Sequence, residues 1–512
     1  MLHFWKGLKM AQQIERGRLK EAPAKEVTDI MVAPTLTEEE VERSYQSYID
    51  INKAHVLMLA KQGIIKEEVA AKILKVAQQM AAMGTKPTFE ITPELEEMYF
   101  NLENYLIEQV GMEIGGQQHT ARSRNDLHAT VDRIVTRKAL LELEKLINKF
   151  RRTLIELAKE NEDAVMSGYT HLQPSEPITF AHYLSAVSAA LTRDYARLAR
   201  AWDSTNLNPL GGGSMGSTTW NIDRLYTTKL LGFDDVVQNS MDCVCSRDYL
   251  LEIMSAISIL ANTLVRMTTD MRIWATPDFG YVEVADKVAV CSSIMPQKKN
   301  PWTFESCASF SARVKGYADA AWMTYKGVPY AFTMESMDLI SNFWPCLKDI
   351  TGILKLMDVS MRDVKIHKDR ARKTAAANFC TVTELANTLV RDEKLSFRAA
   401  HEIVAHVVGY LTENEKKATD IDAEVLNRIS EKLFGKKLSI TDAQIQEALD
   451  PVKNAYSKKV IGGTAPEEVE RQLKVIEEAL SRDEALIAER EAKLAEASEK
   501  LESEVKAIVS KY

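Results

Sequence analysis

The chain has 512 residues, of which 46% are hydrophobic and 27% charged, a balance typical of a soluble globular protein with two or three domains. Glycine (21 residues) and proline (14 residues) are scarce against average usages of roughly 7% and 5%, which favours a mainly helical fold. The formal net charge of −8 argues against nucleic acid as a main partner, but it leaves room for an anionic small substrate, because only local charge matters there.

The first part of the chain is expected to begin irregularly and then to become helical. Residues 1–36 are mixed in charge and show no regular pattern. Thr37 is followed by three glutamates, which is typical of a capped helix start, and helical periodicity then continues to about Met83. Another helix fits residues 93–110 and ends at Gly111.

The middle of the chain contains long helical patterns, which predict a helical bundle. They fit residues 126–161, 178–203, 247–275, 302–325 and 343–363. Most polar motifs lie in the non-helical stretches between them, at residues 115–125, 170–177, 208–217 and 292–301. Because loops on a rigid scaffold usually carry the chemistry, we expect the functional residues in these stretches.

After about residue 370 the predicted segments become shorter, up to a glycine turn at residues 462–464. Residues 467–510 then form a helical pattern with charges of both signs. Its apolar residues include Leu486, Leu494, Leu501, Val505 and Ile508. Such a helix is typical of a solvated surface, and pairing with another chain is the alternative.

Cysteine usage and hydropathy exclude further classes of protein. The six cysteines are scattered and form no C-x-x-C pair, so we expect no zinc site, no disulfide framework and no other metal or cofactor. Reduced thiols of this kind favour a cytoplasmic location. Residues 1–7 lack the apolar core of a signal peptide. No run of about 18 uncharged apolar residues occurs, so no membrane span is expected.

The stretch Cys291–Pro301 carries the strongest functional signal. It combines two serines, a methionine, a turn proline, two lysines and an asparagine in one loop between helical segments. A hydroxyl can move a proton where its surroundings stabilise the alkoxide, and a lysine with an asparagine can hold a carboxylate. This set therefore suits removal of a proton from a carbon beside a carboxylate. An ordinary capped loop is the alternative.

Further polar stretches are weaker signals when each is taken alone. Residues 117–126 place two arginines, a serine and an asparagine before a long helix, where they could grip carboxylates or simply cap the helix. A single histidine such as His171 is more often structural than catalytic. The glycine cluster at 208–216 follows no strand and has the wrong spacing for a dinucleotide fingerprint, so a turn or a close backbone approach is the conservative interpretation.

Together these stretches resemble the argininosuccinate lyase and delta-crystallin branch of the fumarase/aspartase superfamily. The superfamily signature S-S-x-M-P-x-K-x-N-P is met at every specified position by residues 292–301. The branch motifs are matched, in the same order, by His119–Asp126, Tyr169–Gln173, Pro209–Gly213, Asn239–Asp248, Phe279–Asp286, Ser396–His401 and Gly462–Pro466. The resemblance covers roughly residues 40–475.

The resemblance implies an all-α subunit with three domains and a central bundle of long helices. We expect an N-terminal helical domain at 1–125, the bundle with the signature loop at 126–370, and a C-terminal helical domain with a tail helix at 371–512. It also implies a homotetramer whose active sites are assembled from loops of three subunits. The implied activity is that of a carbon–nitrogen lyase, which eliminates an amine from an N-substituted aspartate and releases fumarate without a cofactor.

Roles for single residues follow from the same resemblance. Ser292 would be the base that removes the proton, and Lys298 and Asn300, with Met295 beside them, would hold the carboxylate on which charge develops. His171 would protonate the leaving nitrogen, with Glu305 as its partner. The substrate carboxylates would be held and oriented by Ser123, Arg124, Asn125 and Thr170, and His119 would contribute to the same pocket.

The chain departs from the branch in the part that handles the amine. After Pro329, Phe332 stands in for a tyrosine and Met337 for a glutamine that help related enzymes to hold the arginine part of their substrate. Both replacements lose hydrogen-bonding capacity, and a buried guanidinium without partners is costly. We infer an amine that is less polar than arginine, or one bound by other groups such as Glu335 or Asp338.

Smaller departures are Cys291, where the family usually has glycine before the two serines, and Leu127, where the branch has glutamine. Ethylenediamine-disuccinate lyase, a relative of this branch, gives a precedent for a different amine.

One alternative function is that of a true argininosuccinate lyase of arginine biosynthesis whose arginine contacts come from elsewhere. Another is a catalytically inactive, crystallin-like structural protein, which the complete set of candidate site residues makes less favoured.

Overall fold

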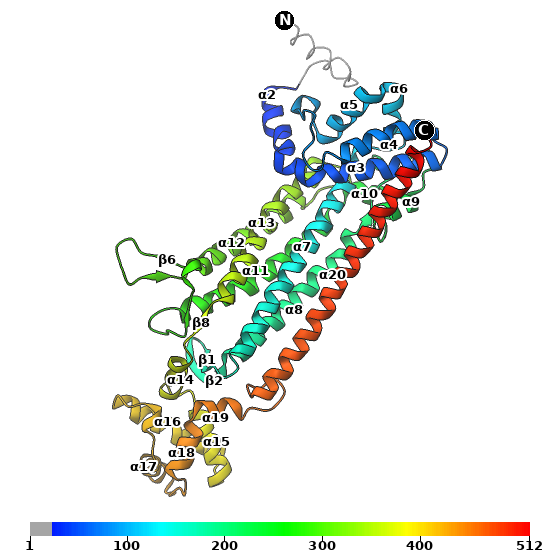
Figure 1. Cartoon of the computed structure of the whole chain (residues 1–512). Coiled ribbons are helices and arrows are strands. Elements are labelled where there is room, and N and C mark those ends of the chain that lie inside the picture. Colours follow the sequence, from blue (N-terminus) through cyan, green and yellow to red (C-terminus); the bar gives the residue numbers. More distant parts are fainter. Residues whose placement is uncertain (1–22) are drawn as a thin grey trace.

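The computed structural model describes residues 23–512, and this part of the chain is almost entirely helical (Figure 1). The all-α prediction is therefore confirmed. Residues 1–22 lie outside the described residues, so the expectations of an irregular start and of no signal-peptide core stay predictions. Residues 25–36, predicted to be irregular, form three short helical segments instead, at Lys25–Val27 (α2), Thr28–Val32 and Ala33–Leu36.

Five long helices run side by side as the central bundle (Figure 1). They are α7 (Arg124–Glu160), α8 (Phe180–Thr205), α11 (Asp248–Trp274), α12 (Trp302–Tyr325) and α13 (Met334–Arg362). The sequence predicted all five, but α13 begins earlier than its predicted start at residue 343. The reason is a reciprocal cap, in which the Thr333 side chain accepts from Ser336 N while the Ser336 hydroxyl accepts from Thr333 N.

Within residues 23–512, α11 is the one helix that is long and apolar enough to cross a membrane. It packs against α8, α12 and α13, and 56% of its most apolar window is buried inside the protein. Its apolar side chains Leu250, Met254 and Leu264 belong to the largest hydrophobic cluster. Burial in the bundle therefore accounts for the hydropathy of α11.

The N-terminal helices lie at one end of the bundle (Figure 1). Their bounds are Glu38–Lys61 (α3), Glu67–Ala81 (α4), Met98–Val110 (α5) and Met112–Gly115 (α6). Thr37 caps α3 as predicted, because its side chain accepts from Glu40 N. The single helix predicted up to Met83 is wrong: the chain turns between α3 and α4, where Gly63 has a φ of +67°.

The C-terminal helices form a separate small cluster at the opposite end of the bundle (Figure 1). They are α14 (Lys368–Ala377), α15 (Val382–Glu393), α16 (Phe397–Glu413), α17 (Ala423–Phe434), α18 (Asp442–Leu449) and α19 (Pro451–Tyr456). The hydrophobic core of this part draws only on residues between 385 and 449. The division at residues 125 and 370 remains a proposal, because the N-terminal cluster also includes Val131 and Val135 of α7 and the bundle cluster includes Ala371 of α14.

The last helix, α20 (Pro466–Val509), runs back along the whole bundle, so that the C-terminus lies beside the N-terminal helices (Figure 1). Leu473 and Ile487 are buried against the bundle, and Leu501 and Val505 are buried in the N-terminal cluster. The side chain of Arg151, fully buried on α7, pairs with Asp483 of α20. The interpretation of this segment as a solvated surface helix therefore holds for its outer face only.

Short strands and helices connect the long ones. Two antiparallel hairpins carry motifs: β1 (Val165–Thr170) with β2 (Gln173–Thr179), and β6 (Val290–Cys291) with β7 (Lys299–Asn300). The other short elements are β3 (Leu207–Asn208), β4 (Asp235–Val236), β5 (Val282–Glu283), β8 (Lys365–Ile366), α9 (Arg224–Leu230) and α10 (Ser240–Cys245).

Candidate active site

The signature motif forms the hairpin of β6 and β7, whose loop projects from the side of the bundle (Figure 1). Val290 pairs with Asn300, and Ser292 N donates to Lys298 O at 3.2 Å, which closes the loop at its base. The loop itself stays open to solvent, and Ile294 at its tip is 83% exposed. An apolar tip of this kind suits a loop that packs against another surface.

The hydroxyl of Ser292 lies among backbone donors. Its Oγ accepts hydrogen bonds from Ile294 N at 3.3 Å and from Met295 N at 3.0 Å. Backbone N–H groups aimed at a hydroxyl oxygen stabilise negative charge on it, since they are fixed before the charge develops. The structure thus supplies donors that a serine base requires and that the sequence did not locate.

The two adjacent lysines of the loop differ in their environment. Lys299 pairs with Asp286 at 2.7 Å and with Glu283 at 3.1 Å, and its hydrogen bond to Asp286 helps to raise the pKa of its ammonium group. Lys298 makes no ion pair with any residue of the described chain. Lys298 is therefore the lysine of this loop whose charge is not neutralised within the described chain.

Thr170 and His171 lie at the tip of the β1–β2 hairpin. His171 and Leu172 are its two turn residues, with φ values of +54° and +58°, while Thr170 pairs with Gln173. Two positive φ angles are typical of a type I′ turn, which usually contains asparagine or glycine. A histidine and a leucine held there are strained, and strain of this kind concentrates at functional sites.

Glu305, the predicted partner of His171, lies in the first turn of α12 and is exposed. No hydrogen bond or ion pair joins it to His171 within residues 23–512. A single chain therefore does not form this pair.

The third group of predicted residues lies where α7 begins. Ser123 caps this helix: its Oγ accepts from Asn125 N at 3.2 Å, and its own N donates to the Asp126 carboxylate at 3.0 Å. The Asn125 amide donates to Ser214 O at 3.0 Å. The two alternatives for this stretch, helix capping and carboxylate binding, are therefore compatible. The cap at Ser123 fixes the backbone from which the side chains of Arg124 and Asn125 project.

The glycine cluster is tied to the same helix start. The buried carboxylate of Asp126 accepts from Gly211 N at 2.9 Å and from Gly213 N at 3.0 Å. Gly213 has a φ of +63°, and a Cβ there would lie 2.5 Å from the carbonyl oxygen of Ser217. The interpretation of the cluster as a turn with close backbone approach is confirmed, but the expectation that no strand precedes it is wrong, because the two-residue strand β3 leads into it.

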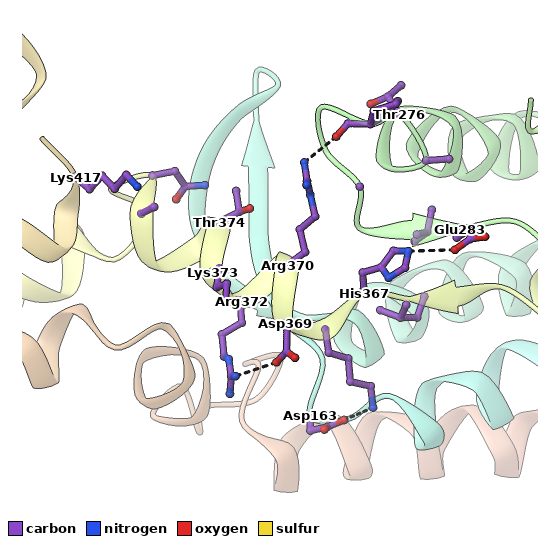
Figure 2. Close-up of a pocket in the computed structure, with 18 residues that line it drawn as sticks. Asp163, Thr276, Glu283, His367, Asp369, Arg370, Arg372, Lys373, Thr374 and Lys417 are labelled. Carbon is purple, nitrogen blue, oxygen red and sulfur yellow. Dashed lines mark hydrogen bonds and ion pairs between the residues drawn. The ribbon is translucent and has the colours of Figure 1, made fainter. Parts of the chain in front are cut away.

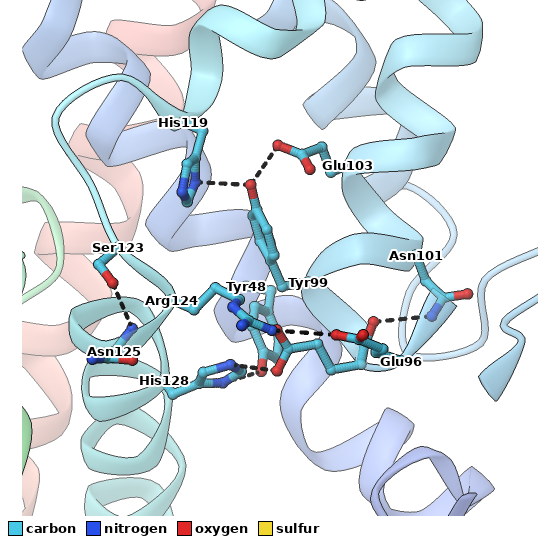
Figure 3. A network of polar contacts seen from close by, with 11 residues as sticks. Tyr48, Glu96, Tyr99, Asn101, Glu103, His119, Ser123, Arg124, Asn125 and His128 are labelled. Atoms are coloured by element: carbon cyan, nitrogen blue, oxygen red, sulfur yellow. Dashed lines mark hydrogen bonds and ion pairs between the residues drawn. The ribbon is translucent and has the colours of Figure 1, made fainter. Parts of the chain in front are cut away.

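Arg124 belongs to a polar network that also contains Glu97, His128 and Tyr48 (Figure 3). Glu97 accepts from Arg124 at 2.9 Å and pairs with His128 Nε2 at 2.7 Å, and His128 Nδ1 contacts the Tyr48 hydroxyl at 2.9 Å. Burial opposes ionisation of Glu97, but hydrogen bonds from His128 and Arg124 lower its pKa overall. A substrate carboxylate at Arg124 would therefore share this arginine with Glu97.

Sequence reasoning missed Glu97, His128 and Tyr48. Glu97 precedes α5 and lies 27 residues before Arg124 in the sequence. No periodicity or motif links two positions at that separation. The one available signal was the extra histidine four residues after Arg124, one helical turn into α7.

His119 lies close to this network and is held in one protonation state (Figure 3). Its Nδ1 lies 2.8 Å from the Tyr99 hydroxyl, which itself donates to Glu103. The Tyr99 oxygen therefore accepts from His119 Nδ1–H, so Nε2 keeps its lone pair. Burial and then the charges of Arg122 and Arg124 lower the pKa of His119 to about 4, so this ring is neutral at pH 7.

The lowered pKa of His119 predicts a pH dependence of stability. Between the ordinary value of 6.5 and the folded value of about 4, the unfolded chain binds a proton that the folded chain rejects. The free energy of unfolding should therefore fall as the pH falls through this window. Thermal unfolding at several pH values should show that the stability of His119→Gln falls less steeply with pH than that of the parent protein. Some decline should remain in the variant, because burial also lowers the pKa of His55. An identical decline in both proteins would contradict this assignment.

The candidate residues form separate groups in one chain. α7 contains 37 residues and is about 55 Å long at 1.5 Å per residue. Ser123, Arg124 and Asn125 lie at its start, whereas the β1–β2 hairpin with His171 lies beyond its other end (Figure 1). The structure brings Ser123–Asn125 together and brings Ser292–Asn300 together. It joins neither group to His171.

Comparisons with known proteins agree with this architecture. A family model described as Lyase matches residues 27–316, and one described as Argininosuccinate lyase C-terminal matches residues 379–455. Argininosuccinate lyase 1 of Shouchella clausii (strain KSM-K16) is 42% identical over 92% of this chain and 95% of its own length. Argininosuccinate lyase of Methanocaldococcus jannaschii is 36% identical over 94% of this chain and 97% of its own length.

A solved structure extends the likeness to three dimensions. The crystal structure of EDDS lyase in complex with formate superimposes with a TM-score of 0.85 and 28% sequence identity, over 98% of both chains. The matched ranges include the signature hairpin, the β1–β2 hairpin and the start of α7. The chain therefore belongs to the argininosuccinate lyase branch of the fumarase/aspartase superfamily and is a carbon–nitrogen lyase that releases fumarate.

Proposed function

We propose that this lyase acts on an N-substituted aspartate whose leaving amine is not arginine. The observation that carries the proposal is the pair Phe332 and Met337, which provide no hydrogen-bonding side chain where the branch has a tyrosine and a glutamine. Phe332 lies in the loop between α12 and α13, and Met337 lies in the first turn of α13. A guanidinium placed against these side chains would lose hydrogen bonds to water without replacing them.

Acidic groups beside this loop offer another way to hold a positively charged amine. Glu335 is exposed, and hydrogen bonds from its own backbone N–H and from the Thr333 side chain lower the pKa of its carboxyl group. The Asp338 carboxylate accepts from the Ser341 hydroxyl at 2.5 Å. One carboxylate can pair with an ammonium group and can also bind a guanidinium through both of its oxygens. The acids therefore offer a partner to a positively charged amine, and the preference against arginine depends on Phe332 and Met337 alone.

The proposed reaction begins at Ser292. Its alkoxide, stabilised by the Ile294 and Met295 N–H groups, removes a proton from the carbon beside the reacting carboxylate. The electron pair left on carbon spreads into that carboxylate, where Lys298 and Asn300, with Met295 beside them, stabilise the added charge. The C–N bond then breaks, and the electron pair forms the double bond of fumarate.

The departing amine must be protonated as it leaves, and His171 would donate this proton, with Glu305 orienting the imidazole. The other substrate carboxylate would be held by Arg124, Asn125, Ser123 and Thr170. Neutral His119 would accept a hydrogen bond through Nε2 within the same pocket. These roles follow the motif positions of the branch. The protonation state of His119 and the cap at Ser123 support the roles near α7, whereas the pairing of His171 with Glu305 requires another copy of the chain.

We further propose that the site is completed by other copies of the chain in a homotetramer, and that the protein acts in the cytoplasm. The separation of the Ser123, His171 and Ser292 groups within one chain supports shared sites. The exposed Ile294 and Leu172, 83% and 70% accessible, lie beside the proposed catalytic groups and would be covered by a neighbouring subunit. Sedimentation analysis should then give a mass of four subunits.

The decisive assay follows fumarate by its absorbance with a panel of N-substituted aspartates. Argininosuccinate, ethylenediamine-disuccinate and an N-alkyl aspartate differ only in the leaving amine. We expect the highest kcat/KM for a substrate without a guanidinium. If argininosuccinate is the best substrate of the panel, the altered specificity is wrong and the second candidate below is correct.

The second candidate is argininosuccinate lyase itself. It is favoured by the 42% identity to argininosuccinate lyase 1 of Shouchella clausii over 92% of this chain. In that case the arginine contacts would come from residues outside positions 332 and 337.

A double substitution tests the specificity loop directly. Phe332→Tyr with Met337→Gln restores two hydrogen-bonding side chains, each worth about 1.5–3 kcal/mol toward a charged partner. The kcat/KM for argininosuccinate should rise by at least about tenfold, which one such hydrogen bond provides, while that for the N-alkyl aspartate changes little. Phe332→Leu with Met337→Leu is the matched control, because it alters shape without adding donors or acceptors. An equal rise in both double variants would show that shape alone is responsible.

A further inference from the structure

A cationic cavity lies beside the C-terminal helices, and its lining is distinct from the residues assigned above. It has a volume of about 1450 Å³ and lies where the end of α11, strand β5 and helix α14 meet the C-terminal helices (Figure 2). None of the candidate active-site residues lines it. Its lining contains five lysine and arginine side chains, Lys368, Arg370, Arg372, Lys373 and Lys417, against the three carboxylates Asp163, Glu283 and Asp369.

Each of the three carboxylates already has a cationic partner. Asp163 pairs with Lys368 at 2.6 Å, and Asp369 pairs with Arg372 at 3.0 Å. Glu283 pairs with Lys299, a residue outside the cavity, at 3.1 Å. Charge within the cavity is therefore not balanced by these acids, since Arg370, Lys373 and Lys417 keep no carboxylate partner in the described chain.

Arg370 is fixed in place without being neutralised. Its guanidinium donates to the carbonyl oxygens of Pro277, Asp278 and Phe279 at 2.7, 3.1 and 2.8 Å. Gly280 allows this approach, because a Cβ at that position would lie 2.6 Å from Arg370 Nε. Carbonyl acceptors orient the side chain but leave its full positive charge, so the chain holds a rigid cation at the cavity wall.

Neutral donors and the helix dipole add to this positive field. The first turn of α14 borders the cavity, and the side chain of His367 at its N-cap lies 3.5 Å from Glu283 instead of capping the helix. The Thr374 hydroxyl lies on the same helix, and Lys417 reaches toward it from the C-terminal part of the chain (Figure 2). Cations from two parts of the chain, hydroxyl groups and backbone N–H groups together match the oxygen atoms of a phosphate group.

We propose that this cavity binds a small molecule that carries a phosphate group, at a site separate from the fumarate-forming one. The volume exceeds the roughly 300–1,000 Å³ of typical ligand pockets, so inorganic phosphate would fill only part of it and a nucleotide could occupy more. The ligand would bridge α14 and Lys417. It would also lie next to Glu283, which is ion-paired to Lys299 at the base of the signature hairpin.

Calorimetric titration of the full-length protein with inorganic phosphate, and separately with ATP, tests the proposal. Each titration is run both without fumarate and with saturating fumarate, which occupies the dicarboxylate site. At least one of the two probes should bind, and tighter binding of ATP would identify a nucleotide as the better ligand. Lys373→Ala with Lys417→Ala should weaken binding at least about tenfold, which corresponds to about 1.4 kcal/mol. Both lysines are exposed, so the variant should keep the thermal stability of the parent protein.

Two controls separate a defined site from general attraction. Lys373→Arg with Lys417→Arg keeps both charges and should keep most of the affinity. Lys432→Ala removes an exposed charge outside the cavity and should change nothing. The proposal is overturned if neither probe binds at millimolar concentration, if fumarate abolishes the binding, or if Lys432→Ala weakens it as much as the double alanine variant does.

Discussion

Replacing Ser292 by alanine is expected to lower the rate of fumarate release by at least about a hundredfold, because a positioned general base contributes about 10²–10⁴ to the rate. The fold should be unaffected, since the Ser292 side chain bonds only to Ile294 N and Met295 N of its own exposed loop. Steady-state fumarate absorbance measures the loss, and circular dichroism with sedimentation verifies the fold and assembly.

Ser293→Ala is the matched control for this experiment. Ser293 is the next residue of the loop, and its hydroxyl makes no hydrogen bond within residues 23–512. This variant should keep most of the activity. If Ser292→Ala turns over at the parental rate, or if the loss appears only in Ser293→Ala, the assignment of the base to Ser292 is wrong.

Replacing His171 by asparagine should lower kcat by about 10²–10⁴ and change KM much less, because the imidazole acts on the departing nitrogen rather than on the bound carboxylates. Asparagine suits this position, since it adopts the left-handed backbone region more easily than other residues with a Cβ. The turn of the β1–β2 hairpin should thus survive. Leu172→Asn, at the neighbouring turn position with a φ of +58°, is the control for changes in the turn alone.

The leaving group offers an independent test of the acid role. An aromatic amine is a weak base and departs without prior protonation, so an N-aryl aspartate should lose far less rate in His171→Asn than an N-alkyl aspartate does. A variant that slows both substrates equally would assign His171 to binding or positioning. A variant that raises only KM would lead to the same conclusion.

Local patterns were enough to predict most of the fold. The five bundle helices follow from apolar periodicity. Thr37 marks the start of α3 because its side chain caps the helix, and Gly111 marks the end of α5 because its backbone can adopt a positive φ. The signature loop and the start of α7 could be placed in the same way, because helix bounds fix where loops occur. Each of these features depends on residues within a few positions of one another.

Contacts over long sequence separations could not be predicted. The link between Arg124 and Glu97, and the packing of α20 against the bundle, depend on pairs that no period connects. The backbone donors to Ser292 depend on the dihedral angles of one exposed loop. The separation of His171 from Arg124 follows from the length and direction of α7, which only the structure gives.

The course of α20 also sets an order for folding during synthesis. Lys53 in α3 is buried, with 1% of its side chain exposed, and its ion-pair partner is Glu502 near the end of the chain. Leu501 and Val505 fill the same N-terminal core. Because α3 is synthesised well before α20, Lys53 stays unpaired and the apolar face of α3 stays open until α20 leaves the ribosome. This end of the bundle is complete only after α20 packs against it.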